Sequence, residues 1–429
     1  MSTVEVSVHG IGAGGFGVGA LPDGKVVFLP RTAPGDRVLV KIVKEKARWA
    51  RGEALKWIKE GPGRRDPPCP LYAQCDGCSL QHMAYQEQLT CKSRLVGDAL
   101  RRLGGLEVTD PEVVPSPAEI RYRNKMTFTL RRLPGGRTVA GLRELGHRGR
   151  VLDIGEECLL PEEPLLEIWR DLRSGWGPQA SLLPQGRELR LTLRIGEEGG
   201  SLLVGGGKGD GDPSSLLSKV PGLSSIWRDT KGNALRHLAG DLTLPVRWGE
   251  DLLVLHGGGF IQVNRGAGEE LYDHVLNEVG DIRGKKVVDA YCGVGVLGRA
   301  MALAGGVVTG IDIDPAGLMA GQANPLEGFQ MVPGRVEEDL EALLPADLVI
   351  LNPPRAGVSD SVPPILIGNS PEKVVYVSCD PATLARDLNR LGGGFQVESV
   401  RSFDLFPQTA HVETVVTLRG LSVSQGKNE

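Results

Sequence analysis

The chain has 429 residues, 41% of them hydrophobic and 24% charged, with a formal net charge of −4. This length suits roughly three domains, and no apolar run approaches the ~20 residues of a membrane helix. The N-terminus lacks the pattern of a secretory signal, and seven cysteines are too few for a disulfide scaffold. We therefore expect a cytoplasmic protein without membrane contact, whose clustered cysteines serve metal binding or catalysis.

Residues 1–61 predict a small barrel. Short strand-like runs alternate there with turn sequences such as Pro22-Asp23-Gly24, a pattern typical of OB-like barrels that carry nucleic acid. Residues 41–65 contain nine Lys or Arg and three acidic residues, and residues 121–137 contain six basic residues and no acidic one. Such patches attract phosphate even on an acidic chain. A solvated basic face is the alternative interpretation.

Residues 62–255 predict a mixed α+β central domain. Leu89, Val96 and Leu100 recur at helical spacing within residues 83–104. Strand-like runs follow between about 120 and 255, and they include 126–130, 189–195 and 252–255. We predict the glycine-rich stretch 196–212 to be a loop.

Four cysteines of the central domain predict a metal centre. Cys69, Cys75 and Cys78 form a C-x5-C-x2-C motif, and Cys158 stands alone further along the chain. Four thiolates can hold an iron–sulfur cluster or zinc. Cys91 is the spare thiol, and its position within the predicted helix favours packing.

From residue 256 to residue 420 helices and strands alternate, which predicts a Rossmann-like α/β domain followed by a polar tail, 421–429. The apolar runs read as buried parallel strands, and they span 287–290, 307–312, 348–351, 374–377 and 415–418. Ligands of such sheets bind at the carboxyl ends of the strands.

A glycine-rich loop follows the first of these strands. Residues 293–298 spell G-x-G-x-x-G, and Asp312 ends the next strand, where a carboxylate suits a ribose hydroxyl. The acid just before the glycines, Asp289, can reach the ammonium of S-adenosylmethionine, whereas a dinucleotide would need the helix N-terminus for its pyrophosphate. We therefore expect S-adenosylmethionine, with a nicotinamide or flavin cofactor as the alternative.

Cys379 and Glu413 predict the chemistry. Cys379 follows the apolar run 374–377, and Glu413 enters the last strand. Carbon 5 of uracil is a poor nucleophile until a thiolate adds to carbon 6, and a base must later remove the carbon-5 proton. One cysteine and one carboxylate in a shared pocket would supply both functions. The alternative is that Cys379 is a buried apolar residue without a catalytic role.

Asn352-Pro353-Pro354-Arg355 supports a different hypothesis. Asn-Pro-Pro followed by an aromatic residue is a pattern of enzymes that methylate exocyclic amines, but Arg355 occupies the aromatic position here. An amine methyltransferase needs no thiol, so activity that survives loss of Cys379 would favour it. An RNA-binding iron–sulfur protein with a vestigial methyltransferase domain is a third hypothesis.

Taken together, these motifs resemble the RNA 5-methyluridine (uracil-C5) methyltransferase family over nearly the whole chain. Residues 1–61 are similar to a TRAM domain, 122–125 to the family's entry into the central domain, and 259–264 to the segment before the methyltransferase domain. The cysteine spacing matches a branch that carries a 4Fe-4S cluster and acts on 23S ribosomal RNA. The resemblance therefore implies an RNA partner, ribosomal RNA rather than transfer RNA, and no protein partner.

The resemblance also implies roles for individual residues. Cys379 matches the nucleophile and Glu413 the proton acceptor, and the cluster ligands are Cys69, Cys75, Cys78 and Cys158. The cofactor-binding positions are Gln262, Tyr291, Asp312 and Asn352. Three positions depart from the family pattern, because Asn352 is usually Asp, Val296 is often Asn and Asp312 is more often Glu.

Overall fold

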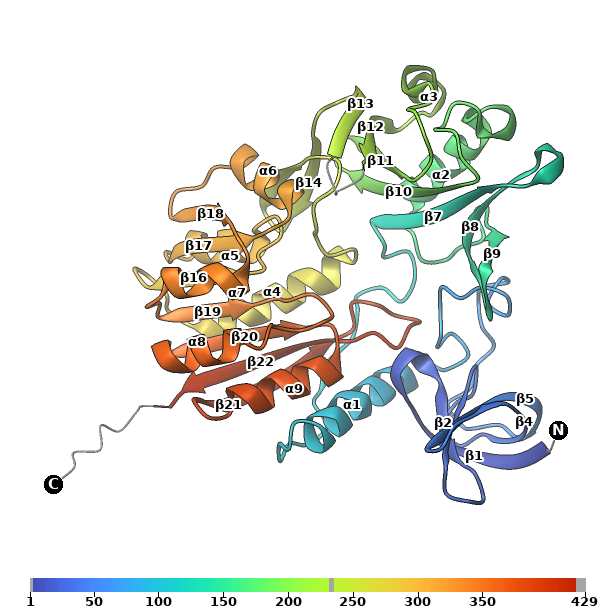
Figure 1. Ribbon diagram of the computed structural model, residues 1–429, viewed down its shortest axis with the longest axis horizontal. Helices are drawn as coiled ribbons and strands as arrows, with labels where there is room; N and C mark the ends of the chain where they lie inside the picture. Colours follow the sequence, from blue (N-terminus) through green and yellow to red (C-terminus); the bar gives the residue numbers. More distant parts are fainter. Residues whose placement is uncertain (1–2, 231–234, 422–429) are drawn as a thin grey trace.

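The N-terminal strands close into a barrel. The computed structural model describes residues 3–230 and 235–421, and Figure 1 shows the barrel at one corner of the molecule. Its five strands follow the order β1-β2-β3-β5-β4, with bounds β1 Thr3–Ile11, β2 Gly17–Ala20, β3 Val26–Leu29, β4 Arg37–Glu45 and β5 Trp49–Lys59. Alternate apolar side chains, Val6, Val27, Leu29, Val38 and Val40 among them, fill its interior.

A second sheet of seven strands forms the central domain, in the order β13-β12-β11-β10-β7-β8-β9. Its strands are β7 Lys125–Arg132, β8 Thr138–Glu144, β9 His147–Asp153, β10 Glu188–Gly196, β11 Gly199–Gly205, β12 Leu223–Asp229 and β13 Leu235–Gly240. Helices α2 (Glu163–Gly175) and α3 (Pro213–Lys219) pack against one face. A separate hairpin of β14 (Leu244–Trp248) and β15 (Asp251–Leu255) leads to the next domain.

The prediction of a loop over 196–212 is wrong for its first half. Residues 199–205 form β11, which pairs with β10 on one side and β12 on the other. Leu202 and Val204 are buried in the core of the central domain. Burial of these two apolar side chains, together with pairing on both edges, outweighs the low strand propensity of glycine.

The third sheet has eight strands in the order β18-β17-β16-β19-β20-β22-β21-β6. They are β6 Val113–Val114, β16 Lys286–Ala290, β17 Val307–Asp312, β18 Phe329–Pro333, β19 Leu348–Leu351, β20 Lys373–Ser378, β21 Phe395–Phe403 and β22 Glu413–Gly420. Strands β16 to β20 are parallel, as predicted. The prediction of a parallel last strand is wrong, because β22 runs antiparallel to both β20 and β21.

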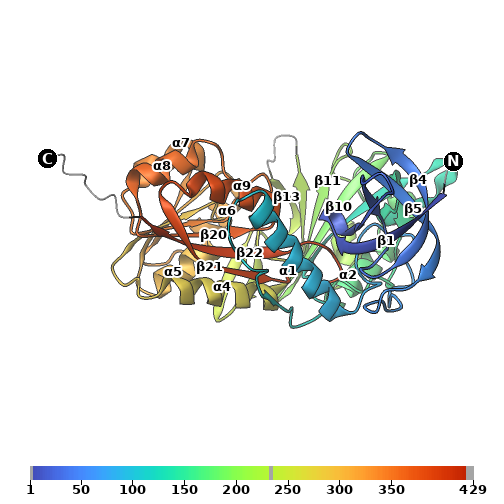
Figure 2. The ribbon, with the colours of Figure 1, turned by 90° about the horizontal axis from the view of Figure 1, so that it is seen from below.

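Helices cover both faces of this third sheet (Figure 2). They are α1 Tyr85–Arg102, α4 Arg265–Val279, α5 Val296–Leu303, α6 Pro315–Ala323, α7 Val336–Asp339, α8 Val362–Asn369 and α9 Pro381–Leu391. Short 3-10 turns occupy Ala13–Gly15, Pro134–Gly136, Pro178–Ala180 and Leu340–Leu343. Within the described residues, no helix combines the length and apolarity needed to cross a membrane.

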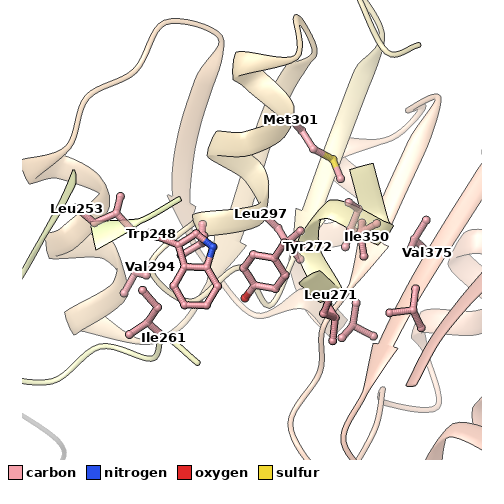
Figure 3. Close-up of a cluster of buried hydrophobic side chains, with 14 of the residues drawn as sticks. Trp248, Leu253, Ile261, Leu271, Tyr272, Val294, Leu297, Met301, Ile350 and Val375 are labelled. Carbon is pink, nitrogen blue, oxygen red and sulfur yellow. The ribbon is translucent and has the colours of Figure 1, made fainter. Parts of the chain in front are cut away.

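Two apolar cores fix the sheet between its helices. One core packs α4 and α5 onto the strands, with Leu271, Leu297, Met301 and Ile350 among its members (Figure 3). The other packs α8 and α9 onto the opposite face and includes Val96 and Leu100 of α1. Helix α1 precedes the strands of the central sheet in sequence, so this contact anchors the segment after the barrel to the third domain.

Candidate active site

The register of β20 and β22 brings the two expected catalytic residues together. Ser378 pairs with Thr414 at the end of the ladder. Beyond this pair, Cys379 follows Ser378 in the chain and Glu413 precedes Thr414. Because β22 is antiparallel, its first residue lies at the same edge of the sheet as the carboxyl ends of the parallel strands. The antiparallel strand that the sequence did not predict is therefore what places the carboxylate beside the thiol.

A single cavity of about 870 Å³ opens at this edge. Its volume lies within the range of small-molecule and cofactor sites. Its lining includes all six residues predicted for catalysis and cofactor binding: Gln262, Tyr291, Asp312, Asn352, Cys379 and Glu413. The cofactor loop and the thiol therefore share one crevice, as expected from their positions after parallel strands.

Two loop amides bind the side chain of Asp312, one from the loop after β16 and one from the loop after β17. The Gly293 amide donates to Asp312 Oδ2 at 2.7 Å, and the Asp314 amide donates to Asp312 Oδ1 at 2.8 Å. Gly293 has φ 58° and Gly295 has φ 82°, a region that glycine adopts without steric cost. The carboxylate expected at a ribose hydroxyl thus also fixes the shape of the loop, and its side chain lines the cavity.

The third glycine of the motif has a packing role. A Cβ at Gly298 would lie 2.5 Å from the Phe329 ring and 2.9 Å from Asp289 Oδ2. Only a residue without a side chain lets α5 approach β16 and β18 this closely.

Asp289 does not lie where the sequence placed it. Its side chain is fully buried, it does not line the cavity, and its Oδ2 accepts a 2.8 Å bond from the Gly298 amide. Burial raises the pKa of Asp289 to about 7, partly offset by that bond. The expectation that this acid reaches a cofactor ammonium is therefore wrong, because β16 carries it inward to the first turn of α5.

The electrostatics of the cavity keep both expected catalytic residues neutral in the free protein at pH 7. Burial raises the pKa of Glu413 to about 8, although the Arg355 guanidinium opposes the shift. Burial and the neighbouring Glu413 raise the pKa of the Cys379 thiol to about 11, again opposed by Arg355. A perturbed acid and a perturbed thiol in one cavity are typical of a functional site.

Among the other residues that line the cavity are four to which the sequence analysis gave no role in catalysis or cofactor binding: Phe260, Arg355, Phe406 and His411. Arg355 Nη2 lies 3.4 Å from His411 Nε2, and the ring of His411 meets that of Phe406 edge-on with centroids 5.9 Å apart. Burial and Arg355 lower the pKa of His411 to about 4, so its ring is neutral. Their positions in the sequence could have indicated two of these residues, because Arg355 follows Asn-Pro-Pro and His411 precedes Glu413 by two residues.

The loop before β22 is tied to α1 by a buried ion pair. Lys92 Nζ lies 2.5 Å from Asp404 Oδ1 and donates to the Phe406 carbonyl at 3.2 Å. Gln408, in the same loop, accepts from the Gln88 side chain at 3.0 Å and from Arg65 at 2.9 Å. Helix α1 thereby fixes the segment that carries His411 and Glu413.

Loss of one member of this pair should strongly destabilise the protein. We expect Lys92→Met to lower the free energy of unfolding by about 3–5 kcal/mol, because it leaves Asp404 buried without a counter-charge. Denaturant unfolding would measure the loss. The double variant Lys92→Met/Asp404→Leu should recover part of it, and Lys285→Met, which breaks an exposed ion pair with Glu372, should cost under about 1 kcal/mol. A small loss for Lys92→Met would contradict the anchoring role.

The four predicted metal ligands line a second, smaller cavity between β8 and the loops around it. Cys69, Cys75, Cys78 and Cys158 all contribute to its wall, with Leu142, Ile154 and Leu160 among the apolar residues. The Gly77 amide donates to Cys75 Sγ at 3.3 Å. Burial raises the pKa of the Cys78 thiol to about 12 and that of the Cys158 thiol to about 11.

The barrel contacts this cysteine loop through one arginine. Arg31 donates to the carbonyls of Cys78, at 2.5 Å, and Cys75, at 2.8 Å. Its guanidinium also lies 3.6 Å from the ring centroid of Tyr72. Among the described residues, no group of three or more His, Cys, Asp or Glu side chains is arranged to ligate a single metal ion.

Comparisons with known proteins identify the family of this chain. Residues 338–420 match the family described as tRNA (Uracil-5-)-methyltransferase, and residues 1–55 match the TRAM domain. An uncharacterized RNA methyltransferase of Gloeobacter violaceus is 35% identical over 97% of this chain and 96% of its own. A second, from Halalkalibacterium halodurans, is 31% identical over the same shares. The chain belongs to the RNA uracil-C5 methyltransferase family.

A solved structure extends this family likeness to the fold. The Pyrococcus abyssi tRNA (uracil-54, C5)-methyltransferase, in complex with S-adenosyl-L-homocysteine, matches with a TM-score of 0.75 and 25% identity. The match covers 96% of this chain and 99% of that chain. The prediction of an RNA methyltransferase with an N-terminal TRAM barrel is thus confirmed, and the non-enzymatic hypothesis is not needed.

Proposed function

We propose that this enzyme methylates carbon 5 of a uridine in RNA, with S-adenosylmethionine as methyl donor, through a covalent bond between Cys379 and the base. The observation that supports it most directly is the pairing of β20 with β22, which sets the Cys379 thiol beside the Glu413 carboxylate in the cavity that also contains the cofactor loop. Amine methylation would not require this thiol and carboxylate.

The residues of the cavity divide the reaction between them. The target uridine leaves its stack to enter the cavity, and the Cys379 sulfur forms a bond to carbon 6 while the ring electrons move to an enolate oxygen. Arg355 stabilises the thiolate, whose proton has passed to solvent. After carbon 5 is methylated, Glu413 takes its proton; the ring double bond re-forms, and the carbon–sulfur bond breaks to release the thiolate.

The donor set of the cavity fits S-adenosylmethionine, which supplies an electrophilic methyl group when bound. Asp312 lies at the carboxyl end of β17 and presents oxygen acceptors to ribose hydroxyls. Gln262, Tyr291 and Asn352 complete the polar wall. Asn352 offers an amide where the family pattern usually has Asp, so it can hydrogen-bond but adds no negative charge.

We assign the substrate to ribosomal RNA and the reaction to the cytoplasm. The support is the cysteine motif, which resembles that of the branch acting on 23S ribosomal RNA; transfer RNA is the competing substrate. Amine methylation remains the second candidate for the reaction because Asn352, Pro353 and Pro354 line the cavity. Arg355 in the following position offers no aromatic face for a flipped base.

One labelling experiment separates these possibilities. RNA from cells lacking the protein, carrying tritium at carbon 5 of its uridines, should release tritium to water in step with methyl transfer. Nucleoside mass spectrometry with mapping would then locate 5-methyluridine in ribosomal or transfer RNA. Methyl transfer without tritium release would contradict carbon-5 methylation and support an amine acceptor.

We further propose that Cys69, Cys75, Cys78 and Cys158 hold a 4Fe-4S cluster. All four face one cavity, where four thiolates can hold a 4Fe-4S cluster or zinc. The C-x5-C-x2-C motif with its fourth cysteine resembles that of the family branch that carries the cluster. The Gly77 amide can donate to the Cys75 thiolate, as amides commonly do to cluster sulfurs.

Metal analysis would test the cluster. Protein purified without oxygen should contain about four irons and about four acid-labile sulfides per chain, with a broad visible absorption band. Cys75→Ala should lose both, whereas Cys91→Ala, a buried thiol of α1 outside this cavity, should keep them. About one zinc per chain and no visible band would instead support the zinc alternative.

A further inference from the structure

A row of polar side chains crosses the central sheet on the face opposite α2 and α3. Lys125 of β7 pairs with Arg194 of β10, Arg194 pairs with Ser201 of β11, and Ser201 pairs with Ser225 of β12. Directly opposed side chains of neighbouring strands lie within about 5.5 Å at their Cβ atoms. The adjacent residues, such as Leu193, point into the core on the other face.

Most of this row is buried and lacks partners. Arg194 is 6% exposed, Ser201 4% and Ser225 1%. Arg194 Nη2 donates to the Gly259 carbonyl at 3.2 Å, but among the described residues its Nη1 and the two serine hydroxyls have no hydrogen-bond partner. Buried charges are normally paired, because an uncompensated one is costly. The row thus presents buried hydrogen-bond donors that lack an acceptor.

The charge of the row points to an anion. Neither Lys125 nor Arg194 forms an ion pair with another described residue. Burial lowers the pKa of Arg194 to about 10, and burial together with Arg194 lowers the pKa of Lys125 to about 7, against the influence of Asp314. Arg190, the next basic residue on this face, is paired with Asp229. Lys125 and Arg194 therefore repel each other, and although Asp314 favours the charged form of Lys125, it forms no ion pair with either residue.

The row adjoins the catalytic cavity. The carbonyl of Gly259 accepts a hydrogen bond from Arg194. The residues that follow it, Phe260 and Gln262, line the cavity, and so does Asp314. In Figure 1 the third domain approaches the central sheet near β14 and α6, and β14 contacts β10 and β11. The half-buried lysine marks the open end of the row. A ligand can reach the row at that end.

We propose that Lys125, Arg194 and Ser201 bind an oxyanion, and that this oxyanion is a phosphate of the RNA close to the target uridine. A planar guanidinium, an ammonium and a hydroxyl suit the oxygens of a phosphodiester. The carboxylate of the methionine moiety of the cofactor offers related chemistry from a second source. The proposal rests on RNA as substrate but not on the covalent mechanism.

Equilibrium binding to the full-length protein tests the site. The probe is a labelled RNA fragment that contains the mapped uridine, titrated over a series of salt concentrations with S-adenosyl-L-homocysteine saturating. We expect Lys125→Gln to weaken RNA binding about tenfold and to reduce the slope of log affinity against log salt by about one. Lys219→Gln, the same charge change on α3 at the opposite face of the sheet, should leave affinity and slope unchanged.

A second variant and a second ligand keep the result interpretable. Arg194→Lys retains the charge but loses the planar set of N–H donors of the guanidinium, so it should weaken RNA binding. Thermal unfolding should show that the variant is folded. S-adenosyl-L-homocysteine affinity, measured separately, should change less than about twofold in both variants. Wild-type RNA affinity and slope in Lys125→Gln would overturn the site, and a loss confined to the cofactor analogue would assign the oxyanion to the cofactor and overturn the RNA assignment. Because binding is measured without turnover, either result is independent of Cys379.

Discussion

Cys379→Ala should abolish methyl transfer, with a loss of about 10⁴-fold or more, because loss of a covalent nucleophile removes the pathway that activates carbon 5. The variant should also fail to form a covalent complex with RNA containing 5-fluorouridine at the target position. Fluorine at carbon 5 cannot leave as a proton, so the wild-type enzyme stops after methylation with its sulfur still bonded to the ring. A denaturing gel that shows a shifted protein–RNA band measures this adduct.

The control for this experiment is another cysteine. Cys91→Ala removes a buried thiol from α1, and it should retain both the adduct and methyl transfer once the folded fraction is matched. Methyl transfer that persists in Cys379→Ala would refute the covalent mechanism and favour the amine methyltransferase.

The reactivity of this thiol depends on what enters the cavity. With a pKa near 11, Cys379 is almost entirely protonated in the free protein at neutral pH. Glu413, one of the causes, is itself mostly neutral at pH 7 because its pKa is about 8. Arg355 is the cation that favours both ionised forms. Thiolate formation is therefore coupled to substrate entry, when the sulfur can transfer its charge to the ring and the enolate oxygen as the bond forms.

Much of this arrangement was predictable from local sequence. Cys379 and the glycine loop follow apolar runs that could only be buried strands, and parallel strands bring their carboxyl ends to one edge. Those two facts suffice to place the thiol and the cofactor loop in one crevice. The four cysteines also share one cavity, although they come from segments about 80 residues apart.

The parts that escaped prediction depend on pairing between distant segments. β11 is rich in glycine and becomes a strand because both of its neighbours supply hydrogen bonds and a core. The antiparallel β22 depends on β21, whose run 395–403 carries charged and polar residues without strict alternation. Asp289 was expected to contact the cofactor. Whether a side chain at the end of a strand points into the core or into the crevice depends on the pleat of the strand, and a shift of one residue reverses its direction.

Glu413→Gln should slow release of the product rather than formation of the bond to Cys379. An amide cannot accept the carbon-5 proton, so methylated RNA should accumulate as a covalent adduct on the protein, and overall turnover should fall by about 10²- to 10⁴-fold. Mass spectrometry of the nuclease-digested adduct would show a uridine with its methyl group, attached to Cys379. Failure to detect an adduct on a folded protein that still binds RNA would count against Glu413 as the base.

The pH dependence separates the two residues. Glu413 acts as a base only when ionised, and its raised pKa of about 8 leaves roughly a tenth of it ionised at pH 7. Proton release, followed as tritium from carbon 5 in a single turnover, should therefore become faster as the pH rises through about 8 and then level off. Adduct formation with 5-fluorouridine RNA should continue to rise towards the pKa of the thiol, about 11.

Arg355 provides the matched test of this assignment. Its guanidinium lowers the pKa of Glu413, so Arg355→Gln should raise that pKa further and move the rise in proton release to higher pH. The same variant should slow adduct formation, since the guanidinium also favours the thiolate. A midpoint that stays in place in Arg355→Gln would show that another group controls the step, and His411, neutral and 3.4 Å from Arg355, would be the next residue to replace.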